Sequence, residues 1–320
     1  MRDRSTAGRT PTYLDWGALG RSGNWRYLLG TILIVIIWFG GQAVVQFALA
    51  PVLGVTFNAD GTVTSSGQAT YLIFNLASFL PFFIATPFIV KVLHKRPGLT
   101  VATPFSRINW GVFGKGVLWW SVAMLIPLIP TIALRPGDFR FNADWSSLAA
   151  VAVVVVVFLI WQTSAEELFF RGYLMQWFGK KKWRNPIFLG ILSGLLFAAP
   201  HLGNPEVREA SGIEFLWGFL AYFMSGFGWA FVSVRSGTIE LALGAHFINN
   251  LVNILFITVE TSALGATSLV IDGAPSITEA GITSVVTTVL FIVFVWRVRG
   301  SGTPRPTPQQ EAVAEPVAAE

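Results

Sequence analysis

The sequence predicts an all-α protein, a polytopic membrane helix bundle with about eight transmembrane helices. Of its 320 residues, 53% are hydrophobic and only 12% are charged, whereas soluble domains carry about 25% charged residues. The mean hydropathy is +0.61. A helix needs about 20 apolar residues to cross the hydrocarbon. Eight apolar runs are expected to do so, although 186–201 is short for a span. They are residues 27–49, 69–91, 114–134, 148–178, 186–201, 213–234, 238–260 and 280–297.

The distribution of basic residues predicts the orientation of the bundle. Eighteen Lys and Arg residues lie before the first run, after the last run and in or beside alternate loops, against three in the other loops. Because loops rich in Lys and Arg stay in the cytoplasm, both termini are expected to be cytoplasmic, in a multi-pass protein of the cell membrane. These basic loops account for the net charge of +5. The expected partner is therefore the lipid bilayer, and no nucleic-acid partner is expected.

Composition divides the chain around one membrane domain. Residues 1–25 are expected to be a cytoplasmic lead-in, 26–147 to hold three transmembrane helices with loops, and 148–260 to form a core with polar motifs. Residues 261–299 hold the last transmembrane helix, and 300–320 are expected to be a disordered cytoplasmic tail. The absence of cysteine excludes disulfides and a thiol nucleophile.

Two adjacent carboxylates and an arginine interrupt the run 148–178, in the stretch TSAEELFFRG. An ionisable group at the bilayer centre costs at least about 2.5–3.5 kcal/mol, so each needs a reason. Glu167 and Arg171 are four residues apart on one helical face and are expected to pair. Glu166 points about 100° away and would be free to react. A buried ion pair that fixes helix packing explains Glu167 and Arg171, but not the second carboxylate.

Two further motifs place polar side chains in other runs. In FAAPH, Pro200 lacks a backbone N–H, so the helix is expected to kink or end beside His201. In HFINN, His246 and Asn250 lie one turn apart on one face. Alone, His201 also fits an interfacial helix end, and His246 with Asn250 fits polar contacts between helices. His94, in the basic loop KVLHKRPG, is expected to be solvated.

The polar groups share a depth at which they could meet. At a rise of about 1.5 Å per residue, they lie about 12–24 Å from the cytoplasmic ends of their helices. A shielded carboxylate near an imidazole can activate water, while a second imidazole and an amide can stabilise an oxyanion. Such a site hydrolyses an amide bond without a covalent intermediate. Zinc held by His and Glu is the competing chemistry, but H-E-x-x-H is absent and Glu167 is committed to Arg171, so neither metal nor cofactor is expected.

In that order and spacing, EELFFR (166–171), FAAPH (197–201) and HFINN (246–250) resemble the three motifs of the CPBP family. These are the CAAX prenyl protease and bacteriocin-processing membrane proteins, also called the Abi family, and the resemblance covers about 148–260. It implies an intramembrane glutamic endopeptidase in which Glu166 is the general base and His201 its partner. By the same resemblance, His246 and Asn250 donate hydrogen bonds to the oxyanion, and Glu167 and Arg171 have a structural role.

The resemblance leaves the substrate and the activity open. Eukaryotic members cut three residues from prenylated C-termini, so a peptide or protein substrate that is hydrophobic, prenylated or otherwise lipidated is expected. A non-catalytic bacteriocin-immunity or scaffold protein of the same fold is one alternative. A proton-coupled transporter that uses Glu and His as a relay is another. The sequence does not predict an oligomeric state.

Overall fold

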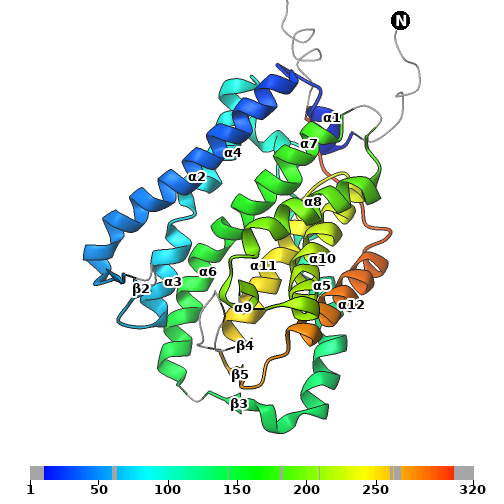
Figure 1. Ribbon diagram of the computed structural model, residues 1–320. Helices are drawn as coiled ribbons and strands as arrows, with labels where there is room; N and C mark the ends of the chain where they lie inside the picture. The colour runs from blue at the N-terminus through cyan, green and yellow to red at the C-terminus, as the bar shows by residue number, and fades with distance from the viewer. Residues whose placement is uncertain are drawn as a thin grey trace, which may run out of the picture.

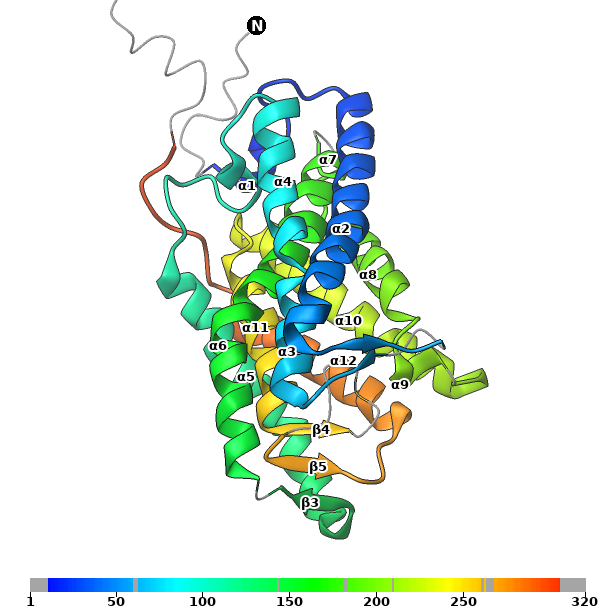
Figure 2. The same ribbon diagram turned by 90° about the vertical axis from the view of Figure 1, so that its left-hand side faces the viewer.

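The computed structural model describes residues 11–305, apart from 60–62, 143, 181–182, 209, 260–261 and 263–267. The first ten residues of the expected lead-in, and residues 306–320 of the expected tail, lie outside the described residues. The described chain is mostly helical, and Figures 1 and 2 show an elongated bundle in which the long helices run roughly along one axis.

Within the described residues, six helical segments are long and apolar enough to cross a membrane. They are α2 (Asn24–Leu53), α3 (Gln68–Ala77) with α4 (Leu80–Leu93), α5 (Trp110–Leu134), α6 (Trp145–Glu167) with η4 (Leu168–Leu174) and α7 (Met175–Phe178), α10 (Gly212–Ser236), and α12 (Ile277–Phe294). Their outer faces are apolar: α6 buries Val151 and Val155 but exposes Val153 and Val156. This pattern is what a lipid-facing helix requires, because lipid solvates apolar side chains.

Two of the expected runs form shorter helices. α8 (Pro186–His201) and α11 (Glu240–Leu255) have 16 residues each. α11 ends before the expected boundary at 260, because the β-branched Ile257–Val259 form a strand. The remaining helical turns are α1 (Tyr13–Trp16), η2 (Gly98–Val101), η3 (Pro136–Asp138) and α9 (Pro205–Arg208).

Two small sheets, which an all-α prediction does not include, lie toward one end of the bundle (Figure 2). β1 (Thr56–Phe57) pairs antiparallel with β2 (Val63–Thr64). β5 (Val270–Asp272) lies between β3 (Phe139–Phe141), which is antiparallel to it, and β4 (Ile257–Val259), which is parallel. The second sheet joins the ends of α5 and α11 to the segment that leads into α12, so it ties three helices together at that end.

Small residues let the helices of the core approach closely. The GILSG segment of α8 packs on α10: a Cβ added at Gly194 would lie 2.8 Å from the Phe223 ring, and one at Gly226 would lie 2.9 Å from the Gly194 Cα. α5 and α11 pack in the same way, since a Cβ at Gly116 would overlap the Leu241 carbonyl oxygen. GILSG therefore serves helix packing, as small residues permit such contacts.

The opposite end of the bundle gathers basic loops and both ends of the described chain, and is called the basic end below. It comprises residues 11–26, 94–109, 183–185, 235–237 and 296–305. The Tyr13 N–H donates to the Gly237 carbonyl (2.9 Å), and the Gly300 N–H donates to the Ser236 carbonyl (2.9 Å). Segments far apart in sequence therefore meet at the loop after α10.

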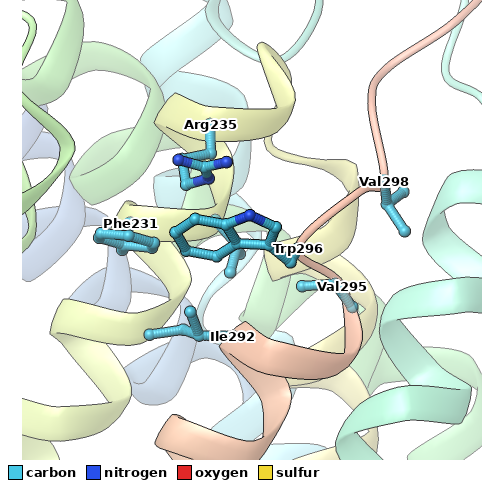
Figure 3. A pocket seen from close by; sticks show the side chains of 7 residues that line it. Phe231, Arg235, Ile292, Val295, Trp296 and Val298 are labelled. Atoms are coloured by element: carbon cyan, nitrogen blue, oxygen red, sulfur yellow. The ribbon is translucent and has the colours of Figure 1, made fainter.

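An arginine and a tryptophan stack at the basic end. The Arg235 guanidinium carbon lies 3.6 Å from the centroid of the Trp296 ring, and Figure 3 shows Phe231 beside the same indole. They line a pocket of about 10 Å³, room for about one water molecule, together with Val232, Ile292, Val295 and Val298. No residue of the expected catalytic site lines this pocket. The stack suits a membrane interface, where amphipathic rings and arginines anchor helices.

His94 is buried, so the expectation that it is solvated is wrong. His94 is 0% exposed. Its Nδ1 lies 2.9 Å from the Arg21 carbonyl oxygen, and its Nε2 lies 2.9 Å from the Tyr173 hydroxyl. Nearby, Arg96 donates to the Gln176 side chain at 2.7 Å. Burial, reinforced by the Arg96 guanidinium, lowers the pKa of His94 to about 4. The basic end is thus tied to η4 and α7 by a buried polar network.

Close packing of α5 predicts opposite effects for two neighbouring glycines. Gly116→Ala places a methyl group against the Leu241 carbonyl, whereas Gly114→Ala enters open space. We expect Gly116→Ala to lower the free energy of unfolding by about 1–3 kcal/mol. Gly114→Ala should be neutral or stabilising by up to about 1 kcal/mol, because alanine favours the helix. Denaturant unfolding in detergent measures both, and equal stabilities would contradict the packing.

The buried His94 predicts a loss of stability in acid. Its pKa of about 4 in the folded protein lies below the ordinary value of 6.5, so between these values the unfolded chain binds the extra proton. This contribution is fully present above about pH 6.5 and is lost as the pH falls toward about 4. Melting temperatures across this range should fall more steeply for the wild type than for His94→Gln. Parallel curves would show that His94 does not titrate as its burial requires.

Candidate active site

The first carboxylate motif lies where the long helix changes its winding. Glu166 and Glu167 end α6, and the next seven residues form the π-helical η4. A π-helical turn is wider than an α-turn and occurs often at functional sites. Here it carries Arg171 and Tyr173, so the same turn connects the carboxylates to the buried network of the basic end.

Glu167 lies at the centre of two polar contacts. Its Oε1 is 2.8 Å from Arg171 Nη1 and 2.8 Å from His246 Nδ1. The Glu167 and Arg171 side chains are fully buried, so the expected pair forms. The guanidinium carbon of Arg171 also lies 4.2 Å from the ring centroid of Phe197 and 5.0 Å from that of Trp229. Aromatic faces therefore cover much of the arginine, and cation–π attraction lowers the cost of its burial.

Glu166 approaches the other nitrogen of the same imidazole. Its Oε1 accepts a hydrogen bond from Gln162 Nε2 at 2.6 Å. Its Oε2 lies 3.7 Å from His246 Nε2, and this buried oxygen has no hydrogen-bond partner within the described part of the chain. A separation above 3.5 Å between two polar atoms suits a bridging water. The two glutamates therefore lie in different environments around the His246 ring. Glu167 is paired with Arg171, whereas Oε2 of Glu166 has no hydrogen-bond partner within the described residues.

Asn250 completes the cluster from the next turn of α11. Its Nδ2 lies 3.4 Å from His246 Nε2 and donates to Gln162 Oε1 at 3.2 Å. Because a carboxylate only accepts, Glu167 requires the proton of His246 on Nδ1. Nε2 therefore faces Glu166 and Asn250. The imidazole is stacked on Trp229, with ring centroids 4.4 Å apart, which fixes the plane of the ring.

His201 lies beside this cluster rather than in it. Its Nδ1 is 2.7 Å from the Phe197 carbonyl oxygen, and its ring stacks on Tyr222 with centroids 4.5 Å apart. In the described chain, no hydrogen bond or ion pair joins His201 to Glu166. The Phe197 ring contacts both histidines, with centroids 4.5 Å from His201 and 5.8 Å from His246.

Two residues of the cluster were not predicted from the sequence. Gln162 joins Glu166 to Asn250, and Trp229 stacks on His246 while facing Arg171. Gln162 had a usable signal, because a polar residue one turn before Glu166 lies on the same face of an apolar helix. Trp229 had none, since one tryptophan in an apolar helix is ordinary packing. Among the described residues, no three His, Asp or Glu side chains converge as metal ligands would.

Comparison with known proteins supports the resemblance of the motifs. Residues 145–252 match the model of the family described as Type II CAAX prenyl endopeptidase Rce1-like. A Bacillus subtilis (strain 168) protein named Uncharacterized protein YyaK is 32% identical over 259 residues, covering 77% of this chain and 82% of that protein. The chain belongs to the Rce1-like family. The match to the Rce1-like family model contains Glu166, Glu167, Arg171, His201, His246 and Asn250. No solved structure matches the chain.

The buried pair predicts strong coupling between Glu167 and Arg171. Removing one partner leaves the other charge unpaired in an apolar interior, which costs about 3–5 kcal/mol. We expect Glu167→Gln and Arg171→Met each to destabilise by about this amount, and the double variant to recover part of the loss. Asp138→Asn, at the half-exposed Arg135–Asp138 pair, is the control and should cost under about 1 kcal/mol. Strictly additive effects in a double-mutant cycle would contradict the coupling.

Proposed function

We propose that this chain is an intramembrane endopeptidase that hydrolyses a peptide bond in a hydrophobic or lipidated peptide, without a covalent intermediate. The observation that carries the proposal is the convergence on His246: the available oxygen of Glu166 lies 3.7 Å from Nε2, and the Asn250 amide lies 3.4 Å from it. Membership in a family of CAAX prenyl endopeptidases supports a proteolytic role.

Water activation is assigned to Glu166, with His201 as its partner. Glu166 Oε2 takes a proton from a water, and the hydroxide attacks the carbonyl carbon of the scissile bond. The same proton then passes to the departing amine, so the water is divided between the two products. A positioned carboxylate that first accepts and then donates a proton acts as a general acid–base catalyst.

The oxyanion is assigned to His246 and Asn250. Two donors 3.4 Å apart can both approach one oxygen at about 2.9 Å, the distance of an oxyanion hole. Donation from Nε2 requires His246 to carry a second proton besides the one on Nδ1, and Glu167, which accepts from Nδ1–H, supplies the opposite charge for that form. Glu167 and Arg171 are therefore structural in this scheme, and no metal takes part in it.

The basic end is assigned to the cytoplasm. We propose eight membrane segments, with α8 and α11 added to the six long ones, and both termini on the cytoplasmic side. In support, the loops that gather the Lys and Arg residues also meet the two ends of the described chain. The rule that basic loops stay inside then orients the bundle. The peptide would be cut within the bundle, between this end and the small sheets.

The proposal predicts that Glu166→Gln abolishes cleavage while the protein stays folded. Loss of a general base lowers the rate by about 10²–10⁴-fold. The measurement compares the membrane peptidomes of cells that carry the wild type or Glu166→Gln, with thermal unfolding of each purified protein. Glu214→Gln, an exposed carboxylate at the start of α10, is the control and should behave as the wild type. A Glu166→Gln strain with the wild-type peptidome and phenotype would favour a non-catalytic immunity or scaffold role.

A further inference from the structure

Four hydrogen bonds form an unbroken chain from α5 to Glu166. Trp120 Nε1 donates to Asn249 Oδ1 (3.2 Å), and Asn249 Nδ2 donates to Asn250 Oδ1 (3.1 Å). Asn250 Nδ2 donates to Gln162 Oε1 (3.2 Å), and Gln162 Nε2 donates to Glu166 Oε1 (2.6 Å). Three side-chain amides therefore connect an indole on one helix to a carboxylate on another.

The chemistry of the two ends dictates the direction of every bond in this chain. An indole N–H can only donate, and a carboxylate can only accept. Each amide between them must accept on its oxygen and donate from its nitrogen, in the order from Trp120 to Glu166. Reversing any one amide would set oxygen against oxygen or nitrogen against nitrogen at a neighbouring link. A buried polar network of this kind stabilises the fold when every hydrogen bond is made, and the loss of one bond is costly because a buried polar group is left without a partner.

The donor end is held rigidly. Trp120 is 1% exposed, and its ring packs against Trp229 and Phe291, with centroids 5.3 Å and 5.1 Å away. The indole N–H therefore has little freedom to leave Asn249. Trp229 in turn stacks on His246, so one aromatic cluster supports both the imidazole and the start of the amide chain.

We propose that Trp120 and Asn249 are positioning residues, which set the direction of the amides and thereby aim Asn250 and Glu166. The proposal rests on the proposed function for the roles of those two groups. With the chain in this direction, Gln162 donates to Glu166 Oε1 and leaves Oε2 as the reacting oxygen. One hydrogen of Asn250 Nδ2 goes to Gln162, and the other points to the His246 side, where the oxyanion forms.

Asn249→Asp tests the direction of the chain with almost no change in shape. Aspartate still accepts from Trp120 but, when ionised, cannot donate to Asn250. The Asn250 amide turns to donate to the new carboxylate, Gln162 follows, and an amide oxygen then faces Glu166. We expect kcat to fall at least about tenfold, with KM within about twofold, because the loss is confined to transition-state groups. The acidic limb of the pH–rate profile should move to higher pH.

The matched control is Asn253→Asp, on the same helix. Asn253 lies one turn further on and donates to the backbone carbonyl of Asn249 at 2.8 Å, outside the amide chain. It receives the same new charge one helical turn away, so it separates the effect of a new charge from the effect of the direction of the hydrogen bonds. We expect it to keep kcat within about threefold of the wild type and to leave the pH profile unmoved.

An infrared titration of purified protein tests the chain of hydrogen bonds without any substrate. In Asn249→Asp, the protonated-carboxyl band that Glu166→Gln removes should persist to higher pH than in the wild type or in Asn253→Asp, because Glu166 has lost its donor. A band that titrates as in the wild type, or a kcat that is unchanged while the wild type cleaves peptide, overturns the proposal. A displaced band in a protein that cleaves nothing supports the amide chain and rejects the proposed function instead.

Discussion

The site depends on one buried carboxylate, Glu167, that is shared between a guanidinium and an imidazole. Its Oε1 lies 2.8 Å from both Arg171 Nη1 and His246 Nδ1. An unpaired charge in an apolar interior would be too costly to hold, so Arg171 is required for Glu167 to be present as an anion. Once the anion is present, His246 must donate from Nδ1, and its other nitrogen is presented to Glu166 and Asn250. A local i,i+4 pair thus determines the tautomer of a residue 79 positions away.

The aromatic residues around this carboxylate make the arrangement rigid. The Arg171 guanidinium faces Phe197 and Trp229, and Trp229 also stacks on His246. These contacts come from α8 and α10, which the small residues Gly194 and Gly226 bring close together. Glycine packing between two helices is therefore what places the rings, and the rings hold the charged groups in one geometry. Preorganised dipoles of this kind are the main source of electrostatic stabilisation in enzyme sites.

The parts of the structure that the sequence predicts are those governed by local spacing and by lipid. Helical spans follow from apolar runs, and the Glu167–Arg171 pair follows from the spacing of one helical turn. Long-range placement did not follow. His94 is buried because Arg21 and Tyr173 come to it from distant segments, and no local pattern in a basic loop reports that. The early end of α11 has the same cause, since β4 needs its partner β5, which lies beyond the gap in the described chain.

The π-helical η4 connects the basic end to the site. It begins directly after Glu167, carries Arg171, and includes Tyr173, whose hydroxyl lies 2.9 Å from His94. Such π-helical turns are rare and occur often at functional sites. Within this one segment, Tyr173 contacts the buried network of the basic end and Arg171 contacts Glu167. The contact between His94 and Tyr173 therefore anchors the same segment that carries Arg171, so the polar groups of the basic end and of the site are joined through a single turn.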